Sequence, residues 1–283
     1  MRIIKRNKYY YLIHSYRIDG KVATLELYLG GTLPKTITSQ KEELYGQCWA
    51  NAFFPRFEVM KNAFQKDWQR YPKSIQQKIL TELSVDFTYN TNAIEGSTLT
   101  HEEVEELIQK NIAPHKSLAD ISEAVQHSKV FLTICQDAPT ITSELLLHWH
   151  KKLFTETKTD IAGVWRDYGV RVGFYIAPDW QDVPELIKEF IQWYRKNEMS
   201  MNPVELAARA HYRFEMIHPF GDGNGRIGRL IIATILAKFQ YPLLIIENAK
   251  KQAYYKALQK EESDFGNYFF CTYQKAHKNL LNK

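Results

Sequence analysis

The feature that most restricts how this chain can fold is a glycine-rich loop between two segments with helical patterning. Apolar side chains recur at helical spacing on both sides of the loop. They are Leu206, Ala210, Phe214 and Ile217 before it, and Ile227, Leu230, Ile231, Ile235 and Phe239 after it. The first helix is expected to end near His218, because a residue before proline disfavours the helical conformation. The intervening Gly221–Gly225 is a loop that a hydrophobic core does not need.

Most of the remaining chain also has helical patterning, and the sequence predicts a mainly α fold. The predicted helices cover residues 41–68, 74–89, 102–111, 118–135, 143–154, 183–196, 203–217, 224–239, 250–261 and 264–281. Pro55 is expected to break or kink the first of them. Start signals support several others: a Thr100–Glu103 capping box, Ser117, Thr142 and the pair Asn202-Pro203.

The first forty residues differ from the rest in structure and in charge. Residues 8–17 and 22–29 have strand patterning, and Asp19-Gly20 between them is turn chemistry, so a β-hairpin is expected. Residues 1–40 also carry the whole formal charge surplus of +5. We therefore expect three regions: an N-terminal hairpin over 1–40, a helical region over 41–100, and a helical core with C-terminal helices over 101–283.

A second β-hairpin is expected between Gly163 and Pro178, where glycines interrupt the helical pattern. Its central residues are Val170, Arg171, Val172, Gly173, Phe174, Tyr175 and Ile176, which we expect to form a strand. From the residues alone, an ordinary surface hairpin and a functional one are equally favoured.

The three cysteines, Cys48, Cys135 and Cys271, are far apart in the sequence. This usage is typical of a reducing compartment and argues against a disulfide framework or a zinc site. No window approaches the length of a membrane span, and no signal-peptide pattern follows the basic start. We expect a cytoplasmic protein without a membrane partner.

The loop has the parts of an anion-binding site. Gly223 and Gly225 allow the backbone to approach a ligand closely. Their N–H groups and that of Asn224 would point outward at the start of a helix, which suits phosphate oxygens. Arg226 and Arg229 are three residues apart and can reach the same side of the first turn. A guanidinium group also suits phosphate better than an ammonium group does.

Two further loop residues can do chemistry beside a phosphate. Asp222 stands where a carboxylate could hold Mg²⁺, which typically uses one or two carboxylates together with substrate phosphates. His218 can exchange a proton near neutral pH. Each residue alone would more often be a helix end, a turn or a solvated face. Together in one short stretch they favour phosphoryl or nucleotidyl transfer.

The stretch His218–Arg229, HPFGDGNGRIGR, resembles the signature of the Fic (filamentation-induced-by-cAMP) family, HxFx[DE]GNGRxxR, and agrees at every fixed position. Such agreement by chance is expected on the order of once in 10¹⁰ starting points. Residues 203–237 and 163–178 resemble the family's core helices and its flap hairpin. The resemblance implies a Fic-type helical core over roughly residues 85–260, with the 1–40 hairpin as an appendage.

The resemblance implies adenylylation, the transfer of AMP from ATP to a hydroxyl group of a target protein. His218 would be the general base, and Asp222 would coordinate Mg²⁺ between the α- and β-phosphates. Phe220 would be buried and fix the loop. The γ-phosphate would bind Arg229, and the anion hole would be Gly223–Gly225. The full set of nucleotide-binding residues would be Gly221, Gly223, Asn224, Gly225, Arg226 and Arg229.

Other functions stay open at this point. Kinase-type members of the family have a lysine-containing loop in place of Gly225-Arg226, and phosphocholine transfer is known on the same scaffold, so the intact GNGR favours adenylylation. Removal of AMP from a modified protein needs the same residues. Nucleic-acid binding by the basic N-terminal hairpin belongs to a different class. We favour instead an arm that packs on the core or on a second subunit.

A second motif, Thr91–Gly96, follows the helix predicted over residues 74–89. On its own it is typical of a helix end closed by Gly96 in the left-handed conformation. Beside a Fic core it resembles the family's inhibitory motif, [ST]xxxE[GN], with matches at Thr91, Glu95 and Gly96. This implies that Glu95 forms a bidentate pair with Arg229 and takes the place of the γ-phosphate, which would hold the enzyme weakly active.

The implied partners are ATP and a protein with a Ser, Thr or Tyr hydroxyl, which can be this protein itself. A homodimer is a further option. The flap would bind an extended strand of the target through main-chain hydrogen bonds.

Overall fold

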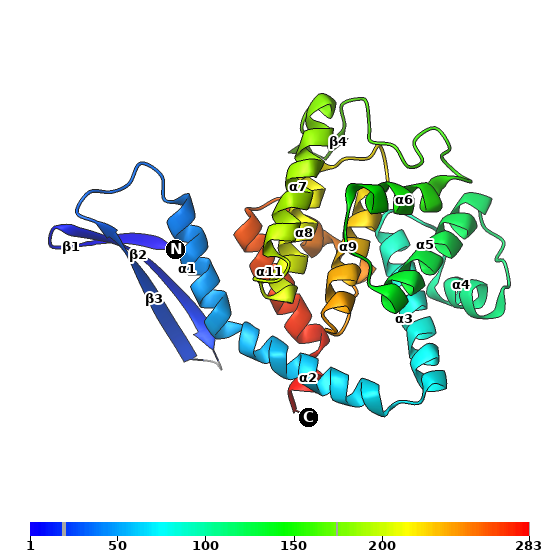
Figure 1. The fold of residues 1–283 in the computed structure, drawn as a ribbon, viewed down its shortest axis with the longest axis horizontal. Helices are drawn as coiled ribbons and strands as arrows, with labels where there is room; N and C mark the ends of the chain where they lie inside the picture. Colours follow the sequence, from blue (N-terminus) through cyan, green and yellow to red (C-terminus); the bar gives the residue numbers. More distant parts are fainter. Residues whose placement is uncertain (19–20, 174, 283) are drawn as a thin grey trace.

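Helices make up most of the chain in the computed structural model, which describes residues 1–18, 21–173 and 175–282 (Figure 1). The predicted mainly α fold is confirmed. Within these residues, the β-structure consists of a three-stranded sheet at the N-terminus and a two-stranded hairpin in the helical body. The turn expected at Asp19-Gly20 and the flap residue Phe174 lie outside the described residues.

Two consecutive helices, α8 (Pro203–Ile217) and α9 (Asn224–Lys238), form the centre of the helical body. The sequence predicted one apolar face for α9, but the structure buries nearly its whole length, polar residues included. Ile227, Leu230 and Ile231 are all 0 % exposed. Burial of each such side chain stabilises the fold by roughly 1.5–3 kcal/mol, so the loop before α9 is anchored to a helix that is buried over nearly its whole length.

The surrounding helices divide into two groups. α7 (Val183–Asn197) and α11 (Glu262–Ala276) pack on α8, whereas α3 (Lys73–Ile94), α5 (Leu118–Asp137) and α6 (Ser143–Phe154) pack on α9. Figure 1 shows the first group to the left of α9 and the second to its right. Three further short elements of the body are η2 (Trp180–Asp182), η3 (Asn248–Lys250) and α10 (Lys251–Leu258).

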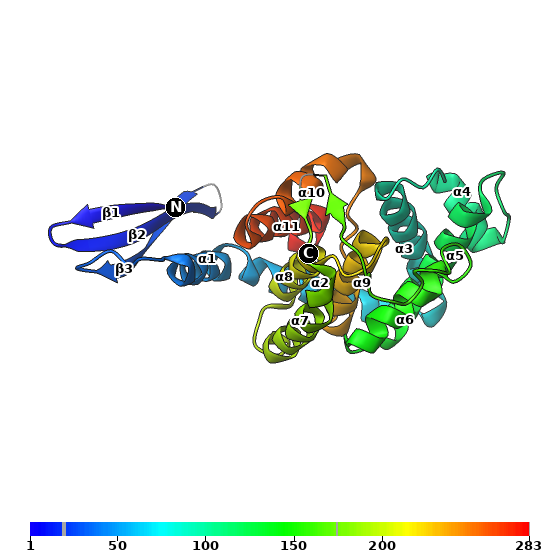
Figure 2. The ribbon, with the colours of Figure 1, turned by 90° about the horizontal axis from the view of Figure 1, so that it is seen from above.

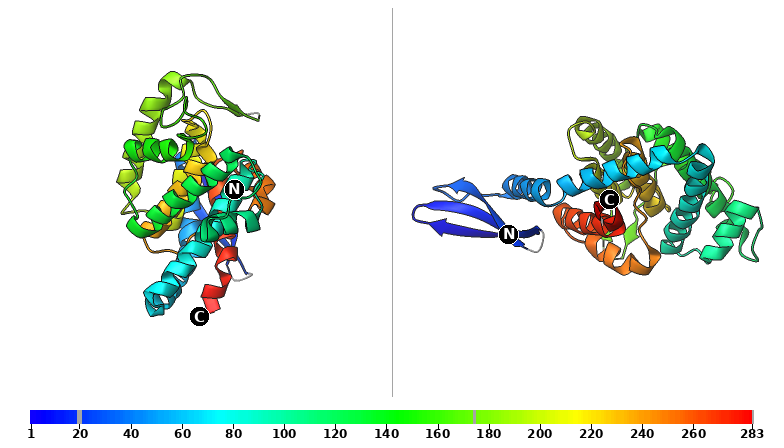
Figure 3. Two further views of the ribbon diagram at one scale, coloured as in Figure 1. Left: turned by 90° about the vertical axis from the view of Figure 1, so that its right-hand side faces the viewer. Right: turned by 90° about the horizontal axis from the view of Figure 1, so that it is seen from below.

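The predicted break at Pro55 is confirmed. α1 (Thr38–Ala52) ends at Phe53, and α2 (Phe54–Arg70) has the proline in its first turn, where its missing N–H is not needed. α2 packs against the C-terminal turn η4 (Lys278–Asn282), and Figure 3 shows it crossing the underside of the body. No helix in the described part of the chain is long and apolar enough to cross a membrane.

α3 extends about one turn beyond its predicted end. Packing favours the extra turn, because Thr91 and Asn92 are buried there although neither is apolar. Gly96 then closes the helix with a φ of 97°, as predicted. Thr91 therefore lies inside the helix, and Glu95 is its C-cap residue.

The predicted helix starts are confirmed. Thr100 and Glu103 form both hydrogen bonds of the capping box, at 3.2 and 2.8 Å. The helix they begin is shorter than predicted: α4 (His101–Glu105) continues into a π-helical turn, η1 (Glu106–Lys110). Three other helices start at the predicted caps Ser117, Thr142 and Asn202.

The N-terminal β-structure has three strands, one more than the predicted hairpin. β1 (Arg2–Arg6), β2 (Tyr9–Ile18) and β3 (Lys21–Gly30) form an antiparallel sheet in that order. The sequence pattern does not reveal β1, because three of its five residues are basic. α1 packs on this sheet, with the rings of His14 and Tyr45 5.2 Å apart. The sheet lies at one end of the molecule, away from the helical body (Figure 2).

Candidate active site

The loop between α8 and α9 is closed by its own hydrogen bonds. His218 ends α8 with a φ of 50°, and Gly223, with a φ of 78°, precedes the first turn of α9. The Asn224 side chain accepts a hydrogen bond from the Phe220 N–H and donates one to the Phe220 carbonyl, both at 2.9 Å. The loop therefore presents the free N–H groups at the start of α9 with a fixed shape, as an anion site requires.

A histidine that the sequence analysis did not single out supports this loop. His150, on α6, stacks on Phe220 with ring centroids 3.9 Å apart. Its Nδ1 accepts a hydrogen bond from the Gly163 N–H, and its Nε2 donates to the Asp222 carbonyl, both at 3.0 Å. Burial lowers the pKa of His150 to about 4, so the ring is neutral, as these two bonds require. In the sequence His150 looks like any residue on the apolar face of a helix.

His218 is a largely buried, neutral histidine, with 17 % of its side chain exposed. Burial is the main cause that lowers the pKa of His218. A neutral imidazole can accept a proton near neutral pH, as a general base must. The His218 carbonyl accepts a hydrogen bond from Arg166 Nε at 2.8 Å, and Arg166 also donates to the carbonyls of Tyr168 and Pro178. Arg166, which the sequence analysis missed, therefore links the loop to the flap.

Glu95 lies against Arg229. Arg229 Nη2 donates to Glu95 Oε1 at 2.5 Å and to the Thr91 carbonyl at 3.1 Å. The expected bidentate geometry is wrong, because Nε and Nη1 of Arg229 have no hydrogen-bond partner among the described residues. The Arg229 side chain is 2 % exposed and that of Glu95 is 24 % exposed. The carboxylate is thus open to solvent on one side, while the guanidinium group is buried.

The same carboxylate lies beside the first turn of α9. A side chain placed on Gly225 would come within 2.3 Å of Glu95 Oε1 and within 3.0 Å of Arg229 Nη1. Glu95 therefore takes up space at a helix start, where the helix dipole and the free N–H groups favour negative charge. The structure brings together the residues for which the sequence predicted inhibition, anion binding and γ-phosphate binding.

Asp222 and Arg226 belong to a second charged cluster, with two residues that the sequence analysis did not name. Lys158 Nζ lies 2.7 Å from Asp222 Oδ2 and 3.0 Å from Glu123 Oε1. Arg226 pairs with Glu123 and lies 3.5 Å from Asp222 Oδ2. Burial alone would raise the pKa of Asp222, but the Lys158 hydrogen bond and the Arg226 charge hold it below its usual value. Two acids and two bases balance each other in this cluster.

The loop offers one carboxylate to a divalent cation. Asp222 Oδ1 accepts the Gly223 N–H at 2.5 Å, which leaves Oδ2, and 43 % of the side chain is exposed. No group of three or more His, Cys, Asp or Glu side chains suited to a metal ion occurs in the described part of the chain. A single, partly exposed carboxylate fits Mg²⁺, because this ion completes its shell with water and substrate phosphates.

A buried polar cluster of His211, Glu215 and Tyr254 lies beside α9. A side chain on Gly228 would come within 2.5 Å of Glu215 Oε1. His211 Nε2 and the Tyr254 hydroxyl are hydrogen-bonded at 2.7 Å, and Glu215 Oε2 is 4.0 Å from His218 Nδ1. Burial raises the pKa of Glu215 to about 8, so this carboxyl is mostly protonated at neutral pH. Nothing in a single sequence indicates such an environment.

We expect Glu215 to make the protein less stable as the pH rises from about 5 to about 8. An unfolded glutamate has a pKa of about 4.3, so in this window the folded protein holds a proton that the unfolded chain releases. Glu215→Gln should reduce this loss of stability, whereas Glu189→Gln, at an exposed position on α7, should not. Urea unfolding at both pH values measures the effect. Equal pH dependence in wild type and Glu215→Gln would contradict it.

The flap hairpin is present, but it is shorter than expected. β4 (Arg171–Val172) pairs with β5 (Tyr175–Ile176), so the range 170–176 contains two strands instead of one. The positive φ of Gly173, 60°, places a turn in the middle of the predicted strand. Val170 flanks the hairpin and accepts a hydrogen bond from the Ala177 N–H at 3.3 Å. Ile176 is 70 % exposed, which leaves part of the flap open to solvent.

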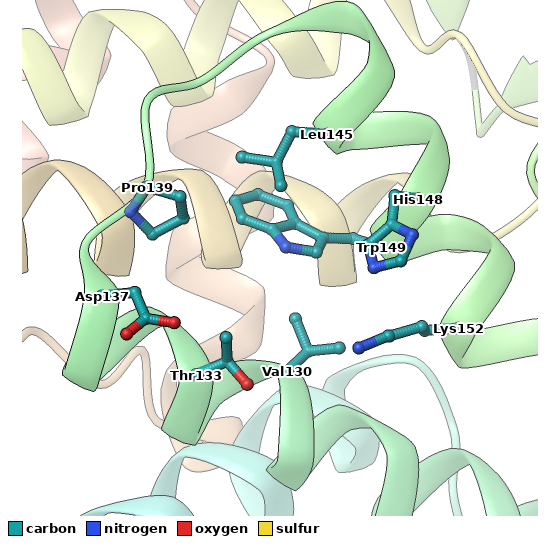
Figure 4. Close-up of a pocket in the computed structure, with 8 residues that line it drawn as sticks. All are labelled: Val130, Thr133, Asp137, Pro139, Leu145, His148, Trp149 and Lys152. Atoms are coloured by element: carbon teal, nitrogen blue, oxygen red, sulfur yellow. The ribbon is translucent and has the colours of Figure 1, made fainter.

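A surface pocket between α5 and α6 is separate from this site (Figure 4). It is lined by Val130, Thr133, Asp137, Pro139, Leu145, His148, Trp149 and Lys152. These residues belong to α5, α6 and the connection between the two helices, so the pocket adds no group to the loop.

Comparison with known proteins supports the resemblance drawn from the sequence. Residues 140–236 match the model of the Fic/DOC family. The chain is 29 % identical over 192 residues to the protein adenylyltransferase Fic of Nematostella vectensis, which covers 65 % of this chain and 44 % of that protein. It is 30 % identical over 186 residues to the protein of the same name from Culex quinquefasciatus, covering 63 % of this chain and 37 % of that protein. The chain thus spans less than half the length of these curated relatives.

Solved structures share the fold. A Fic domain containing signaling protein from Bacteroides thetaiotaomicron matches with a TM-score of 0.71 and 23 % identity, over 80 % of this chain and 96 % of that one. Residues 134–508 of Fic-1 from C. elegans match with a TM-score of 0.68 and 20 % identity, over 80 % of this chain and 72 % of that one. The family match at residues 140–236 includes the loop from His218 to Arg229, so the part of the chain that carries the candidate site is similar to the Fic/DOC family.

Proposed function

We propose that this protein is an adenylyltransferase, which moves AMP from ATP to a hydroxyl group of a protein. The names of its relatives, protein adenylyltransferase Fic, support this activity. The observation that carries the proposal is the position of Glu95. An internal carboxylate lies on Arg229 at the start of α9, where the loop is built to accept an anion.

In the proposed reaction, the oxygen of a Ser, Thr or Tyr hydroxyl attacks the α-phosphorus of ATP. A bond forms between that oxygen and the phosphorus, the bond to the departing pyrophosphate breaks, and the hydroxyl proton passes to the neutral imidazole of His218. The N–H groups of Asn224 and Gly225 stabilise the negative charge, together with Arg226 and Arg229. Gly223 precedes them in the loop, and its own N–H donates to Asp222 Oδ1. Gly221 completes the nucleotide-binding loop at a position where a side chain would come within 2.0 Å of the Tyr168 hydroxyl, and the flap presents the target strand.

We propose that Asp222 holds Mg²⁺ through Oδ2, the carboxylate oxygen that the Gly223 N–H does not engage. When bound, the ion supplies positive charge to the phosphates. Glu95 sets the basal rate in this proposal, because Arg229 has to leave Glu95 before it can bind a phosphate. Thr91 supports the resting arrangement through its carbonyl, and Gly96 ends the helix that positions Glu95.

The proposed partners are ATP and a protein substrate, including a second copy of this chain. The free cysteines Cys48, Cys135 and Cys271 fit a reducing compartment such as the cytoplasm. A homodimer and nucleic-acid binding by the N-terminal sheet stay predictions.

Label transfer from ATP tests the proposal. The Glu95→Gly variant is incubated with a lysate of the source cells and ATP labelled at either the α- or the γ-phosphate. The α-label should enter protein and the γ-label should not, and mass spectrometry should find AMP on a hydroxyl side chain. Incorporation of the γ-label would indicate a kinase, and incorporation of neither would contradict the proposal. Release of AMP from a pre-adenylylated protein by the wild type, lost in Glu95→Gly, would identify hydrolysis as the activity.

A further inference from the structure

We infer that Lys158 is the resident counter-ion of Asp222, and that a divalent cation has to displace the Lys158 ammonium group to bind there. The inference rests on the proposed role of Asp222 as the cation ligand and adds the residue that controls access to it. Lys158 would thereby set the cation affinity of the site.

Only one carboxylate oxygen of Asp222, Oδ2, is left to bind a cation, and the Lys158 ammonium group contacts that oxygen. Oδ1 accepts the Gly223 N–H at 2.5 Å, whereas Oδ2 lies 2.7 Å from Lys158 Nζ. The Lys158 ammonium group also lies 4.7 Å from the centre of the Phe154 ring, and its side chain is only 34 % exposed. These contacts hold the amine in place more firmly than a solvated surface lysine.

Glu123 can keep the Lys158 ammonium group as an ion-pair partner after a cation displaces it from Asp222. Glu123 Oε1 is 3.0 Å from Lys158 Nζ and accepts the Thr157 hydroxyl at 2.9 Å, and Glu123 also pairs with Arg226. Its side chain is 11 % exposed, so solvent screens these charges weakly. When a cation takes Asp222, Lys158 keeps one carboxylate partner and is not left unpaired.

This arrangement favours cations of higher charge. A monovalent ion brings no more charge to Asp222 than the ammonium group that it would replace, whereas a divalent ion brings twice as much. Displacement of Lys158 breaks its hydrogen bond to Asp222 Oδ2. Hydrogen bonds between two charged groups are stronger than those between neutral groups. We therefore expect Lys158 to weaken divalent-cation binding by about tenfold, the effect of losing one such bond.

The test measures binding of Mn²⁺ to the nucleotide-free full chain, through the electron paramagnetic resonance signal of the free ion. The site in question is the part of the binding that Asp222→Asn removes. Lys158→Met keeps the unbranched stem over Phe154 and should bind Mn²⁺ about tenfold more tightly than the wild type at this site. Lys151→Met, which removes a charge from the preceding helix α6, is the matched control and should stay near the wild type. Lys158→Gln repeats the measurement if Lys158→Met lowers the Tm.

The outcomes separate this inference from the proposed function. Equal Mn²⁺ affinity in wild type and Lys158→Met, with Asp222→Asn weakening both, would overturn the role of Lys158 and leave Asp222 as a cation ligand. A gain in Lys151→Met as large as that in Lys158→Met would also overturn it, because the effect would then be one of general charge. If Asp222→Asn changed Mn²⁺ binding in neither background, the proposed cation role of Asp222 would fail and the inference with it.

Discussion

His218→Ala, made in a Glu95→Gly background, is expected to lower AMP transfer by roughly 10²–10⁴-fold, the contribution typical of a general base. The imidazole of His218 is neutral because it is buried, so at neutral pH it can take the hydroxyl proton of the target. Nucleotide affinity should change little, because the N–H groups at the start of α9, Arg226 and Arg229 all stay in place. The loss should therefore fall on kcat and leave KM for ATP nearly unchanged.

Incorporation of α-labelled ATP gives the rates, and calorimetric titration with a non-reactive ATP analogue gives the affinity. His148→Ala is the matched control, because His148 is an exposed histidine on α6 that lines the separate pocket. Transfer in His218→Ala at the rate of the His148→Ala control would rule out His218 as the base. Loss of nucleotide binding in His218→Ala would instead show that the residue holds the loop in shape.

The parts of this site that are contiguous in the sequence could be predicted, because local chemistry determines them. Gly223 and Gly225 mark a loop, and His218 precedes a proline that ends a helix. A loop with a purely structural role does not require this combination of residues, so the combination indicates a functional site. The helix starts were predicted for the same reason, since a cap such as Thr142 acts on residues two or three positions away. Each of these inferences needs only a few neighbouring residues.

The supporting residues could not be predicted, because their partners are distant in the chain. Glu123 and Lys158 meet Asp222 and Arg226 only when α5 and the turn after α6 pack beside α9. His150 has the pattern of an ordinary core residue until its ring is seen against the loop. The same limit explains β1, which is too short and too basic to be recognised until β2 pairs with it.

Glu95→Gly is expected to raise automodification at least about tenfold, as the loss of one strong ion pair that competes with ATP would. In the wild type, the Arg229 guanidinium group donates to Glu95 Oε1 at 2.5 Å, and the carboxylate takes up space beside Gly225. Removal of the Glu95 side chain frees the Arg229 guanidinium group and the space beside Gly225, so the polyphosphate of ATP can reach the start of α9. The Glu95→Gln variant, which fills the space without the charge, should be activated to an intermediate level.

The same change leaves the buried Arg229 without its counter-ion, since its side chain is only 2 % exposed. We therefore expect Glu95→Gly to lower the Tm, and saturating ATP to raise the Tm of this variant more than that of the wild type. Glu102→Gly, at an exposed acid in the first turn of α4, is the control and should change neither quantity by a comparable amount. Equal rates of α-label incorporation in Glu95→Gly and Glu102→Gly would contradict inhibition by Glu95. ATP would then bind productively while Glu95 is paired with Arg229, and the pair would only stabilise the fold.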